Sequence, residues 1–581
     1  MNIAVVIPTY WSRKKDDPWI EGDAIYDHPT PLDGDDTLGR TLESMKLLDN
    51  QNFKLIIPVC PTTDEIEDEA EDIVRRIVEE ADLGFPTYIF TQKNLRNIKT
   101  YLRDKGLSEK SNMLLNQKGY SNVRNICLYS AHVLGVDATI LIDDDEVFEN
   151  TAYVDMAVEF IGKRIYGKGI YGVAGYYLNK YDEFYDDVNI VPWMTYWDRF
   201  GSKTKAFDKI IACDPRIKVT PFAFGGAMVI HKNLLKMVPF DPAVRRGEDI
   251  DYLINAKMFG YDFFLDNKLN VKHLPPKKNH PVWKRLREDT YRFMYERAKI
   301  RSQYEVNNMT KVSADDFAPY PGDFLRGDLE DKIYKTNVLL ALDYLANGNI
   351  DGCQESLRNI YLSKNDAIPK KDPFTEYRRR QKEWVELIDL TSNERMDVRK
   401  IMESNNITRM HYKIDPDRYK NISNTVKLDN FSKFEDFKGL TEDELLTLAS
   451  ITEMRAYNDS DPVFLEGDNS LELFLIITGC VRIVEFNSKK EEIVLGTVCS
   501  NGVIGETFMV KDSYNVTGIA NEFTELMALK KEDLTRLIEE EPALGNKLLF
   551  IFLDRLYFKL NRTNALYKEK VIDEESLTEM Y

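Results

Sequence analysis

The chain has 581 residues, of which 43% are hydrophobic and 30% are charged. This composition is typical of folded proteins with roughly two to four domains, and it excludes the disordered and fibrous classes. Lys and Arg number 78 and Asp and Glu 97, which leaves a net charge of −19 that opposes binding to nucleic acid and to anionic bilayers.

The N-terminal part alternates between short apolar runs and helical patterns. Strands are predicted at 3–7, 55–59, 87–91 and 138–142, and helices at 65–81 and 124–135. Short buried strands that alternate with helices indicate a parallel sheet, in which ligands bind beyond the carboxyl ends of the strands. Pro8, Thr9 and Tyr10 fall at such an end, and an insertion at 95–118 is predicted to act as a mobile lid.

The rest of the chain shows a strand pattern first and then a long helical pattern. Strand character returns at 222–231, and helical periodicity dominates 282–303 and 329–402. A last amphipathic helix is predicted at 546–562. We therefore divide the chain into an α/β domain at 1–280, a helical region at 281–402, a polar linker at 403–430, a β-rich domain at 431–568 and a tail at 569–581.

The six cysteines form no CxxC pair. We therefore expect reduced, mostly buried thiols, and neither a zinc ribbon nor a disulfide framework. The start of the chain shows no basic leader, and no apolar run approaches the ~18 residues that a membrane helix needs. These features predict a cytoplasmic protein without a transmembrane segment.

The segment ILIDDDEVF, residues 140–148, places four carboxylates at the end of an apolar run. Like charges repel and lose hydration on burial, so this arrangement needs a cation or an open surface. The D-x-D spacing lets Asp143 and Asp145 point toward one face of an extended segment, and Mg²⁺ and Mn²⁺ prefer such oxygen ligands. The pattern favours a divalent metal site, and the alternatives are a solvated acidic loop and a helix N-cap.

Six segments in order resemble the family-2-type glycosyltransferases, which have the GT-A fold, a Rossmann-like α/β fold of nucleotide-diphospho-sugar transferases. They are IAVVIPTY, GYSNVRNICL, IDDDEVF, FGGAMVIHKNLL, RRGEDIDYLI and VKHLPP. Their order and spacing match that family over roughly residues 1 to 300. The resemblance implies transfer of a sugar from a UDP- or GDP-linked donor to a hydroxyl acceptor, with Mg²⁺ or Mn²⁺ stabilising the departing diphosphate.

The resemblance also implies which residues bind the metal and the donor. Asp145 would bind the metal, His273 would be a further ligand, and Asp143 would serve the metal or the ribose. Donor contacts are implied for Pro8, Thr9, Tyr10, Asp64, Arg124, Asn125, Asp143 and Asp144. The chain departs from the family at PVCPTTDE, where a D-x-S-x-D-like turn is common, so the contact of Asp64 is the least supported of these.

The RRGEDIDY segment supplies the candidate base. The acceptor hydroxyl loses a proton as it attacks, and the resemblance gives that proton to Asp249, with Glu248 nearer the acceptor and Asp251 as a less favoured base. Acidic residues at a helix N-terminus are an alternative explanation of the same pattern. For the acceptor, Trp193 and Trp197 are candidates for stacking on sugar rings, and core packing is the alternative.

Residues 431–560 resemble the cyclic-nucleotide-binding domain of the catabolite activator and cyclic-nucleotide-dependent kinase families, through FKGLTEDELLTLAS, FLEGDNSLELFLIITGCVRIVE and NGVIGETFMV. The resemblance implies a β-roll in which backbone N–H groups after Gly505 and the carboxylate of Glu506 hold the cyclic phosphate and ribose. Asn515 aligns with an Arg that grips the phosphate in that family. Because Asn lacks the charge and the paired donors of Arg, ordinary cyclic AMP binding is not expected.

The sequence therefore predicts a metal-dependent, inverting glycosyltransferase joined to a regulatory or oligomerising cyclic-nucleotide-binding-like domain. Homo-oligomers would form through the helical region or through the C-terminal domain. Two alternatives stay open. One is a retaining transferase of the same fold, and the other is a cyclic-nucleotide sensor or scaffold whose transferase domain is inactive.

Overall fold

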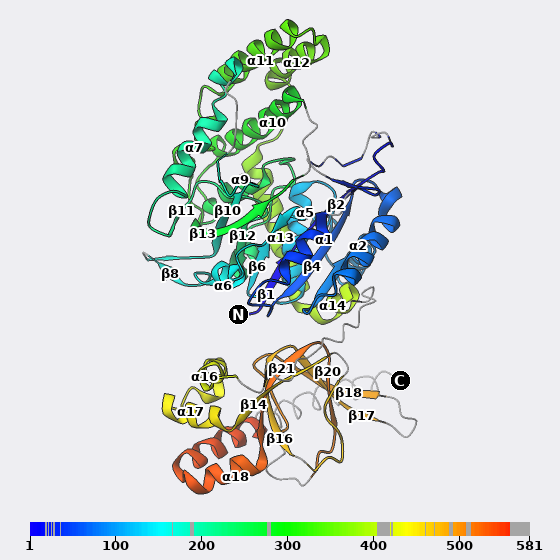
Figure 1. The fold of residues 1–581 in the computed structure, drawn as a ribbon, viewed down its shortest axis with the longest axis vertical. Helices are drawn as coiled ribbons and strands as arrows, with labels where there is room; N and C mark the ends of the chain where they lie inside the picture. Colours follow the sequence, from blue (N-terminus) through cyan, green and yellow to red (C-terminus); the bar gives the residue numbers. More distant parts are fainter. Residues whose placement is uncertain are drawn as a thin grey trace, which may run out of the picture. The chain divides into compact units, whose positions relative to one another are not determined.

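The computed structural model of the chain divides into two compact units, unit 1 (Met1–Ile407) and unit 2 (Thr408–Tyr581) (Figure 1). The structure describes residues 1–557 except 18, 19, 21, 22, 25, 27, 28, 35, 36, 166, 186–190, 276–280, 404–418, 420, 421, 459, 460, 470, 487–491 and 507–512. The division falls inside the predicted linker at 403–430, most of which lies outside the described residues, as does the predicted tail.

A mixed sheet forms the centre of unit 1. Eleven strands of the described residues join it in the order β11-β13-β10-β12-β6-β1-β4-β2-β3, with β5 beside β4 and β7 beside β13. The strands are β1 (Ile3–Val6), β2 (Thr9–Ser12), β3 (Thr30–Pro31), β4 (Lys54–Pro61), β5 (Thr87–Phe90), β6 (Ala138–Leu141), β7 (Glu146–Val147), β10 (Gly172–Leu178), β11 (Ile217–Val219), β12 (Met228–His231) and β13 (Phe263–His273). A separate pair consists of β8 (Arg164–Ile165) and β9 (Lys168–Gly169).

The four strands predicted near the N-terminus correspond to β1, β4, β5 and β6. They pair in parallel in the order β5-β4-β1-β6, whereas β12 is antiparallel to both β6 and β10. All residues of β1 and β6 are buried, which explains their unbroken apolar sequences. Because parallel strands end at the same edge of a sheet, the residues that follow Val6 and Leu141 meet at that edge.

Helices pack around this sheet. They are α1 (Thr37–Met45), α2 (Glu67–Ala81), α3 (Gln92–Asp104), α4 (Glu109–Asn112), α5 (Tyr120–Val133), α6 (Tyr153–Val158), α7 (Arg199–Ile210), α8 (Lys232–Met237), α9 (Glu248–Met258), α10 (Val282–Arg301), α11 (Leu329–Ala346), α12 (Ile350–Lys364), α13 (Pro373–Asn393) and α14 (Arg395–Glu403), with 3-10 turns η1 (Asp64–Ile66), η2 (Pro192–Thr195), η3 (Ala314–Phe317) and η4 (Gly322–Phe324). Helix α5 is buried along almost its whole length and packs on β1, β4 and β6.

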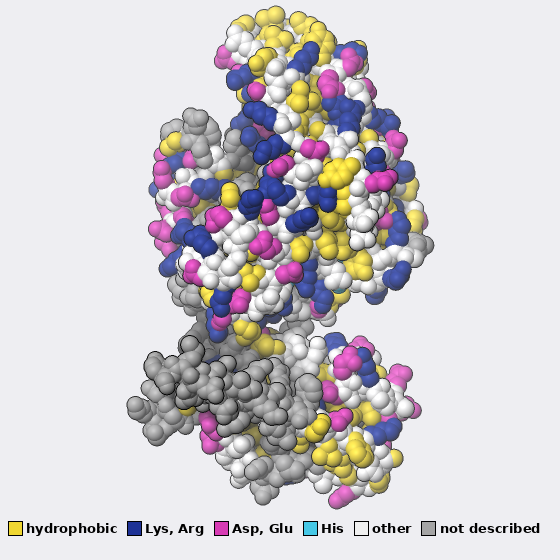
Figure 2. Space-filling view, turned by 180° about the vertical axis from the view of Figure 1, so that it is seen from behind, with side chains coloured by type: hydrophobic (Ala, Val, Ile, Leu, Met, Phe, Trp, Pro, Cys, Tyr) yellow, Lys and Arg dark blue, Asp and Glu magenta, His cyan; other side chains and the backbone are white. Residues whose placement is uncertain are grey.

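The helical region after residue 281 is partly integrated with the sheet. Trp384 of α13 donates its indole N–H to the carbonyl of Leu235 at 2.9 Å, and α13 and α14 share a hydrophobic core with α5. Helices α11 and α12 instead form a hairpin at one end of unit 1 (Figure 1). Hydrophobic side chains gather on the surface at this end (Figure 2), and the exposed ones on the hairpin include Leu342, Leu345 and Ile350.

The structure does not support the predicted lid at 95–118, because much of this segment forms the helices α3 and α4, and α3 is packed on the core of unit 1. Helix α3 begins at a capping box in which the side chains of Thr91 and Asn94 each accept from the backbone N–H of the other. Leu95, Ile98 and Leu102 of α3 are buried in the core of unit 1. Their spacing is that of one face of an amphipathic helix, and this face holds the insertion in place.

A buried ion-pair network fixes helix α9. The Nζ of Lys299 on α10 lies 2.7 Å from Asp251 and 2.9 Å from Asp241, and all three side chains are buried. Arg380 of α13 also binds Asp241. Removing one partner would leave a buried charge uncompensated, so the network favours a single arrangement of α9, α10 and α13. Asp251, the less favoured candidate base, is held in this network and does not line the cavity described below.

Unit 2 contains two four-stranded sheets in its described part, β14-β21-β16-β19 and β15-β20-β17-β18. Its elements are α16 (Asn424–Phe431), η5 (Glu435–Phe437), α17 (Glu442–Ser450), β14 (Thr452–Tyr457), β15 (Pro462–Phe464), β16 (Glu472–Thr478), β17 (Cys480–Phe486), β18 (Glu492–Cys499), β19 (Val503–Ile504), β20 (Thr517–Ala520), β21 (Thr524–Lys530) and α18 (Lys531–Glu540). The last helix, predicted at 546–562, is described over 542–557 and packs Leu544, Leu548 and Phe552 into the core of this unit. The predicted β-roll is confirmed.

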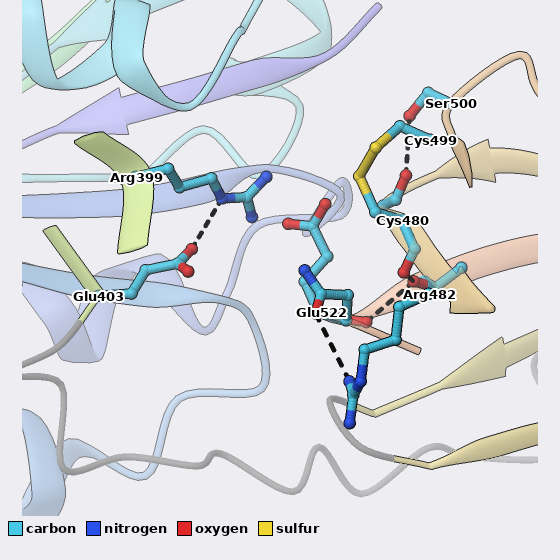
Figure 3. Close-up of a disulfide and its surroundings, with 10 residues drawn as sticks. Arg399, Glu403, Cys480, Arg482, Cys499, Ser500 and Glu522 are labelled. Atoms are coloured by element: carbon cyan, nitrogen blue, oxygen red, sulfur yellow. Dashed lines mark hydrogen bonds and ion pairs between the residues drawn. A yellow bond between two sulfur atoms is a disulfide. The ribbon is translucent and has the colours of Figure 1, made fainter. Parts of the chain in front are cut away.

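A disulfide joins Cys480 to Cys499 (Figure 3). The two residues face each other in the β17–β18 pairing, with Cα atoms 4.0 Å apart. The prediction that all six cysteines are reduced is therefore wrong for this pair, because strand register brings them together and their sequence spacing does not reveal it. Cys60 and Cys127 are buried thiols, as expected.

No helix within the described ranges is both long and apolar enough to cross a membrane.

Candidate active site

A cavity of about 230 Å³ opens in unit 1 where β1 and β6 end. Its lining combines carboxylates, arginines, aromatic rings and two glycines, namely Tyr10, Tyr120, Arg124, Asp143, Asp144, Asp145, Tyr177, Arg199, Gly225, Arg246, Gly247, Glu248, Asp249, His273 and Arg292. Eight of the predicted site residues are in this set. Pro8 and Thr9 precede Tyr10 but are buried and not part of the lining.

The acidic turn after β6 is largely buried. Asp144 and Asp145 are each 7% exposed and Glu146 is fully buried, which does not fit a solvated acidic loop. The backbone N–H of Tyr10 donates to Asp144 at 3.3 Å, and the N–H of Asp143 donates to Glu146 at 3.0 Å. Burial raises the pKa of Asp144 and of Glu146 well above the ordinary values, and the neighbouring carboxylates raise both further.

Asp145 and His273 form the part of the cavity that suits a divalent cation. His273 ends β13, which pairs with β7, and its Nε2 lies 3.4 Å from Oδ1 of Asp145. The ring of Tyr177 stacks on the imidazole with 4.7 Å between ring centroids. A carboxylate oxygen facing an imidazole nitrogen is a fitting pair of ligands for Mn²⁺ or Mg²⁺, because substrate oxygens and water commonly complete the shell of these ions.

Asp143 does not join Asp145 and His273 in a three-residue ligand set, so that part of the prediction needs correction. Across the described ranges, no group of three or more His, Cys, Asp or Glu side chains is arranged to hold a metal ion. Asp143 instead accepts from Nη2 of Arg124 at 2.8 Å and is 3.5 Å from the hydroxyl of Tyr177. The contact with the ribose, the other role that the resemblance implied for Asp143, stays a prediction.

Arg124 of α5 links the acidic turn to α9. Its side chain is 3% exposed, and its Nε lies 3.4 Å from Glu248 while its Nη2 binds Asp143. Its Nη1 is buried and has no hydrogen-bond partner among the described residues. A Cβ at Gly225 would lie 2.5 Å from the Arg124 Nη2. Glycine at position 225 therefore leaves room for the guanidinium.

Glu248 and Asp249 occupy the first turn of α9 at the cavity. Gly247 precedes them with φ +74°, and a Cβ there would overlap the guanidinium of Arg292, so glycine is required. Burial raises the pKa of Glu248 to about 7, with the neighbouring Asp249 adding to the effect, and burial also raises the pKa of Asp249. A carboxylate with a raised pKa is better suited to accept a proton near neutral pH.

Besides Pro8 and Thr9, two more predicted donor contacts, Asn125 and Asp64, lie outside the cavity lining. The side-chain amide of Asn125 is committed to the backbone of Phe240, donating to its carbonyl at 2.9 Å and accepting from its N–H at 2.8 Å. The side chain of Asp64 is 75% exposed and lies 2.9 Å from Nζ of Lys118. Neither residue lines the cavity, so both donor-contact predictions are corrected: the first is a buried structural amide and the second a surface ion pair.

Trp193 and Trp197 do not form an acceptor platform, so that prediction is corrected as well. They are 8% and 3% exposed and belong to a hydrophobic core that also includes α10 and α11 residues. The Trp197 ring lies 5.0 Å from that of Phe324 and 5.9 Å from that of Phe293, measured between centroids. Their faces are therefore covered by protein and not offered to a sugar ring.

Sequence reasoning missed seven residues that line the cavity, namely Tyr120, Tyr177, Arg199, Gly225, Arg246, Gly247 and Arg292. Four of them lie inside the quoted motifs: Tyr120 in GYSNVRNICL, Gly225 in FGGAMVIHKNLL, and Arg246 and Gly247 in RRGEDIDYLI. A closer reading of those motifs would have found them. The other three stand outside any motif, and only the packing of their elements brings them to the site.

In unit 2, the segment that resembles a phosphate cassette begins at Gly505. This residue has φ +85°, and a Cβ there would lie 2.5 Å from the carbonyl oxygen of Glu472, so the turn requires glycine. Glu506 is 4% exposed, residues 507–512 lie outside the described ranges, and Asn515 is exposed. The position of the expected phosphate-binding Arg thus carries a neutral side chain.

Residues 454–541 match the family described as cyclic nucleotide-binding domain. The chain is also similar to the cyclic AMP receptor protein of Thermus thermophilus, with 29% identity over 121 residues, which are 21% of this chain and 56% of that protein. Unit 2 contains a cyclic nucleotide-binding domain. The chain thus spans about half the length of this curated relative, and the activity and partners of the whole protein are matters for proposal.

Two solved structures are similar to part of the chain. A cyclic nucleotide-binding domain from Methylobacillus flagellatus is 24% identical, and the match covers 24% of this chain and 79% of that one with a TM-score of 0.22. The catabolite activator protein of Thermus thermophilus is 28% identical, with 22% and 62% covered and a TM-score of 0.20.

Proposed function

We propose that unit 1 is a metal-dependent, inverting glycosyltransferase with a GT-A fold, which moves a sugar from a UDP- or GDP-linked donor to a hydroxyl acceptor. The observation that carries this proposal is the convergence of three separate segments on one cavity. They are the acidic turn after β6, His273 at the end of β13, and Glu248 with Asp249 at the start of α9.

The sheet is compatible with this proposal. The parallel strands β5-β4-β1-β6 continue into the antiparallel β12, and the cavity lies beyond the carboxyl ends of β1 and β6. Ligands of open α/β sheets bind in this position. The same edge brings together the residues with charges suited to a nucleotide diphosphate.

The donor would bind along the acidic turn. When bound, a divalent cation at Asp145 and His273 supplies Lewis-acid stabilisation for the negative charge of the departing diphosphate. Arg124 contributes a positive charge to the same side of the cavity. Its Nη1, which has no hydrogen-bond partner among the described residues, would donate to an oxygen of the nucleotide sugar. Asp143 and Asp144 present acceptor oxygens for ribose hydroxyls.

The acceptor would react at Asp249. Its carboxylate takes the proton of the acceptor hydroxyl while the oxygen forms a bond to the anomeric carbon, and the bond from that carbon to the diphosphate oxygen breaks with its electron pair. Attack opposite the leaving group inverts the anomeric configuration. A retaining transferase of the same fold is the alternative, and the anomer of the product separates the two.

A panel of nucleotide sugars tests the proposal. We expect the full chain to release nucleotide diphosphate from one donor only when Mn²⁺ or Mg²⁺ is present. Asp145→Asn should lower that rate by about 10²-fold or more, because it removes the charged ligand of the cation. Asp64→Asn, the matched change at an exposed carboxylate outside the cavity, should leave the rate unchanged. Equal release without metal, or full activity of the Asp145 variant, would contradict the proposal.

The pH dependence of release tests the role of Asp249. Burial raises the pKa of Asp249 above its ordinary value, so the proton-accepting form is lost as pH falls through this raised pKa. We expect the rate to drop about tenfold per pH unit once the pH falls below the raised pKa of Asp249. Asp249→Asn should remove most activity and leave the residual rate independent of pH in that range. A wild-type rate that stays flat down to pH 3.8, the ordinary pKa of an Asp carboxyl, would rule out a base with a raised pKa.

For unit 2 we propose a regulatory or oligomerising role that does not depend on ordinary cyclic AMP binding. The match of residues 454–541 favours a second candidate for the whole chain, a cyclic-nucleotide sensor or scaffold whose unit 1 transfers no sugar. Asn515 is exposed and neutral, and it lacks the charge and paired donors of Arg, which favours weak binding of a cyclic phosphate. Association through the helical region or unit 2 stays a prediction.

Calorimetry of the full chain with cyclic AMP and cyclic GMP distinguishes these roles. We expect no saturable binding in the micromolar range. Asn515→Arg should strengthen binding by about tenfold or more, because Arg adds charge and two parallel donors. Asn424→Arg on α16, which adds the same charge elsewhere in the unit, should have no such effect. Tight binding by the unaltered chain would support the sensor instead.

A further inference from the structure

Three arginines line the cavity on the side of Asp249, and the resemblance assigned a role to none of them. Arg199 comes from α7, Arg246 from the loop before α9, and Arg292 from α10. The donor-binding wall described above uses Asp145, His273 and Arg124, so these three cations have no role in it. Because they lie beside the candidate base, we consider which negatively charged group of a ligand they would bind.

Arg292 is the most enclosed of the three. Its side chain is 5% exposed, and its guanidinium lies against Gly247, two residues before Asp249. Its Nη2 donates to the hydroxyl of Tyr320 at 3.0 Å, and its buried Nε faces Glu296 at 3.8 Å, which is too long for a hydrogen bond. Burying a guanidinium with an unused donor is costly, so a ligand that accepts from this cluster would be bound strongly.

Two carboxylates outside the cavity lining, Asp289 and Glu296, lie close to these arginines. Asp289 lies 2.8 Å from Arg199 and 3.8 Å from Arg292, so one carboxylate is shared between two guanidinium groups. Glu296 lies 3.8 Å from Arg292, and burial raises its pKa to about 8, which favours its neutral form near neutral pH. The buried Nε of Arg199 also lacks a hydrogen-bond partner within the described residues.

The N-terminal end of α9 lies beside Arg292. The helix runs over 11 residues, and its N-cap, Gly247, offers no side-chain acceptor. The N-terminal end of a helix carries a partial positive charge and backbone N–H groups that favour anions. Helix α9 therefore places backbone N–H groups beside Arg292, and its first turn also carries the carboxylates of Glu248 and Asp249.

We propose that Arg199, Arg292 and the start of α9 bind an anionic group, a phosphate or a carboxylate, carried by the acceptor. The inference rests on the proposed function, which makes Asp249 the base. The acceptor oxygen has to approach Asp249, and a second group on the same molecule then meets the arginines beside it. Guanidinium groups hold both anions through paired N–H donors. The acceptor class is thus an anionic molecule with a free hydroxyl, not a neutral sugar.

Calorimetry with three small probes that share a hydroxyl-bearing scaffold tests the inference on the full chain. They are glycerol 3-phosphate, glycerate and glycerol. We expect one or both anions to bind and glycerol not to bind. Arg292→Gln and Arg199→Gln should each weaken anion binding by about tenfold or more. Arg326→Gln, at an arginine that is 46% exposed and paired with Asp315, is the matched control and should not change it.

A second series is run with Mn²⁺ and saturating UDP or GDP. Anion binding that persists there, and that is lost in both arginine variants while they still bind UDP or GDP, supports a separate acceptor site. Displacement of the nucleotide by the anion, equal affinity in the Arg292 and Arg199 variants, or no anion binding overturns the inference. If the anions bind through the arginines but no nucleotide binds with Mn²⁺, the anion site stands and the glycosyltransferase proposal fails.

Discussion

The ion pairs of Arg124 are the constraint on which the rest of the site depends. Its buried guanidinium lies 2.8 Å from Asp143 and 3.4 Å from Glu248, and so joins the turn after β6 to the start of α9. Carboxylates at low exposure repel one another and lose hydration, and a cation between them offsets both effects. Without Arg124, the two acidic segments would not be stable at one cavity.

Glycines make this crowding possible. Gly225 leaves space for Arg124, Gly226 for the carboxylate of Glu146, and Gly247 for Arg292. In each case a Cβ would collide with a charged side chain of the site or its immediate surroundings. The charges can approach closely because backbone without side chains lies beside them, and the Lys299 network then holds α9 in place. Packing of α10 and α13 on the sheet domain is thus coupled to the geometry of the site.

Sequence reasoning succeeded where a local pattern determines the structure. Buried parallel strands and the acidic residues at their ends follow from hydrophobic runs that stop abruptly, and the cavity contains most residues taken from the motifs. It failed where the outcome depends on packing between distant segments. Arg292 reaches the cavity from a helix with no motif, Trp197 turns inward, and Cys480 meets Cys499 through strand register. None of these is encoded in a short stretch of residues.

The central claim is that the cavity of unit 1 binds a nucleotide sugar beside a metal ion. The most direct measurement is a crystal structure of the full chain with Mn²⁺ and the nucleotide diphosphate of the active donor, with the anomalous signal of manganese recorded. We expect a manganese peak within coordinating distance of Asp145 and His273, with diphosphate oxygens completing its shell. Manganese and nucleotide bound elsewhere, or a diphosphate in this cavity without metal, would contradict it.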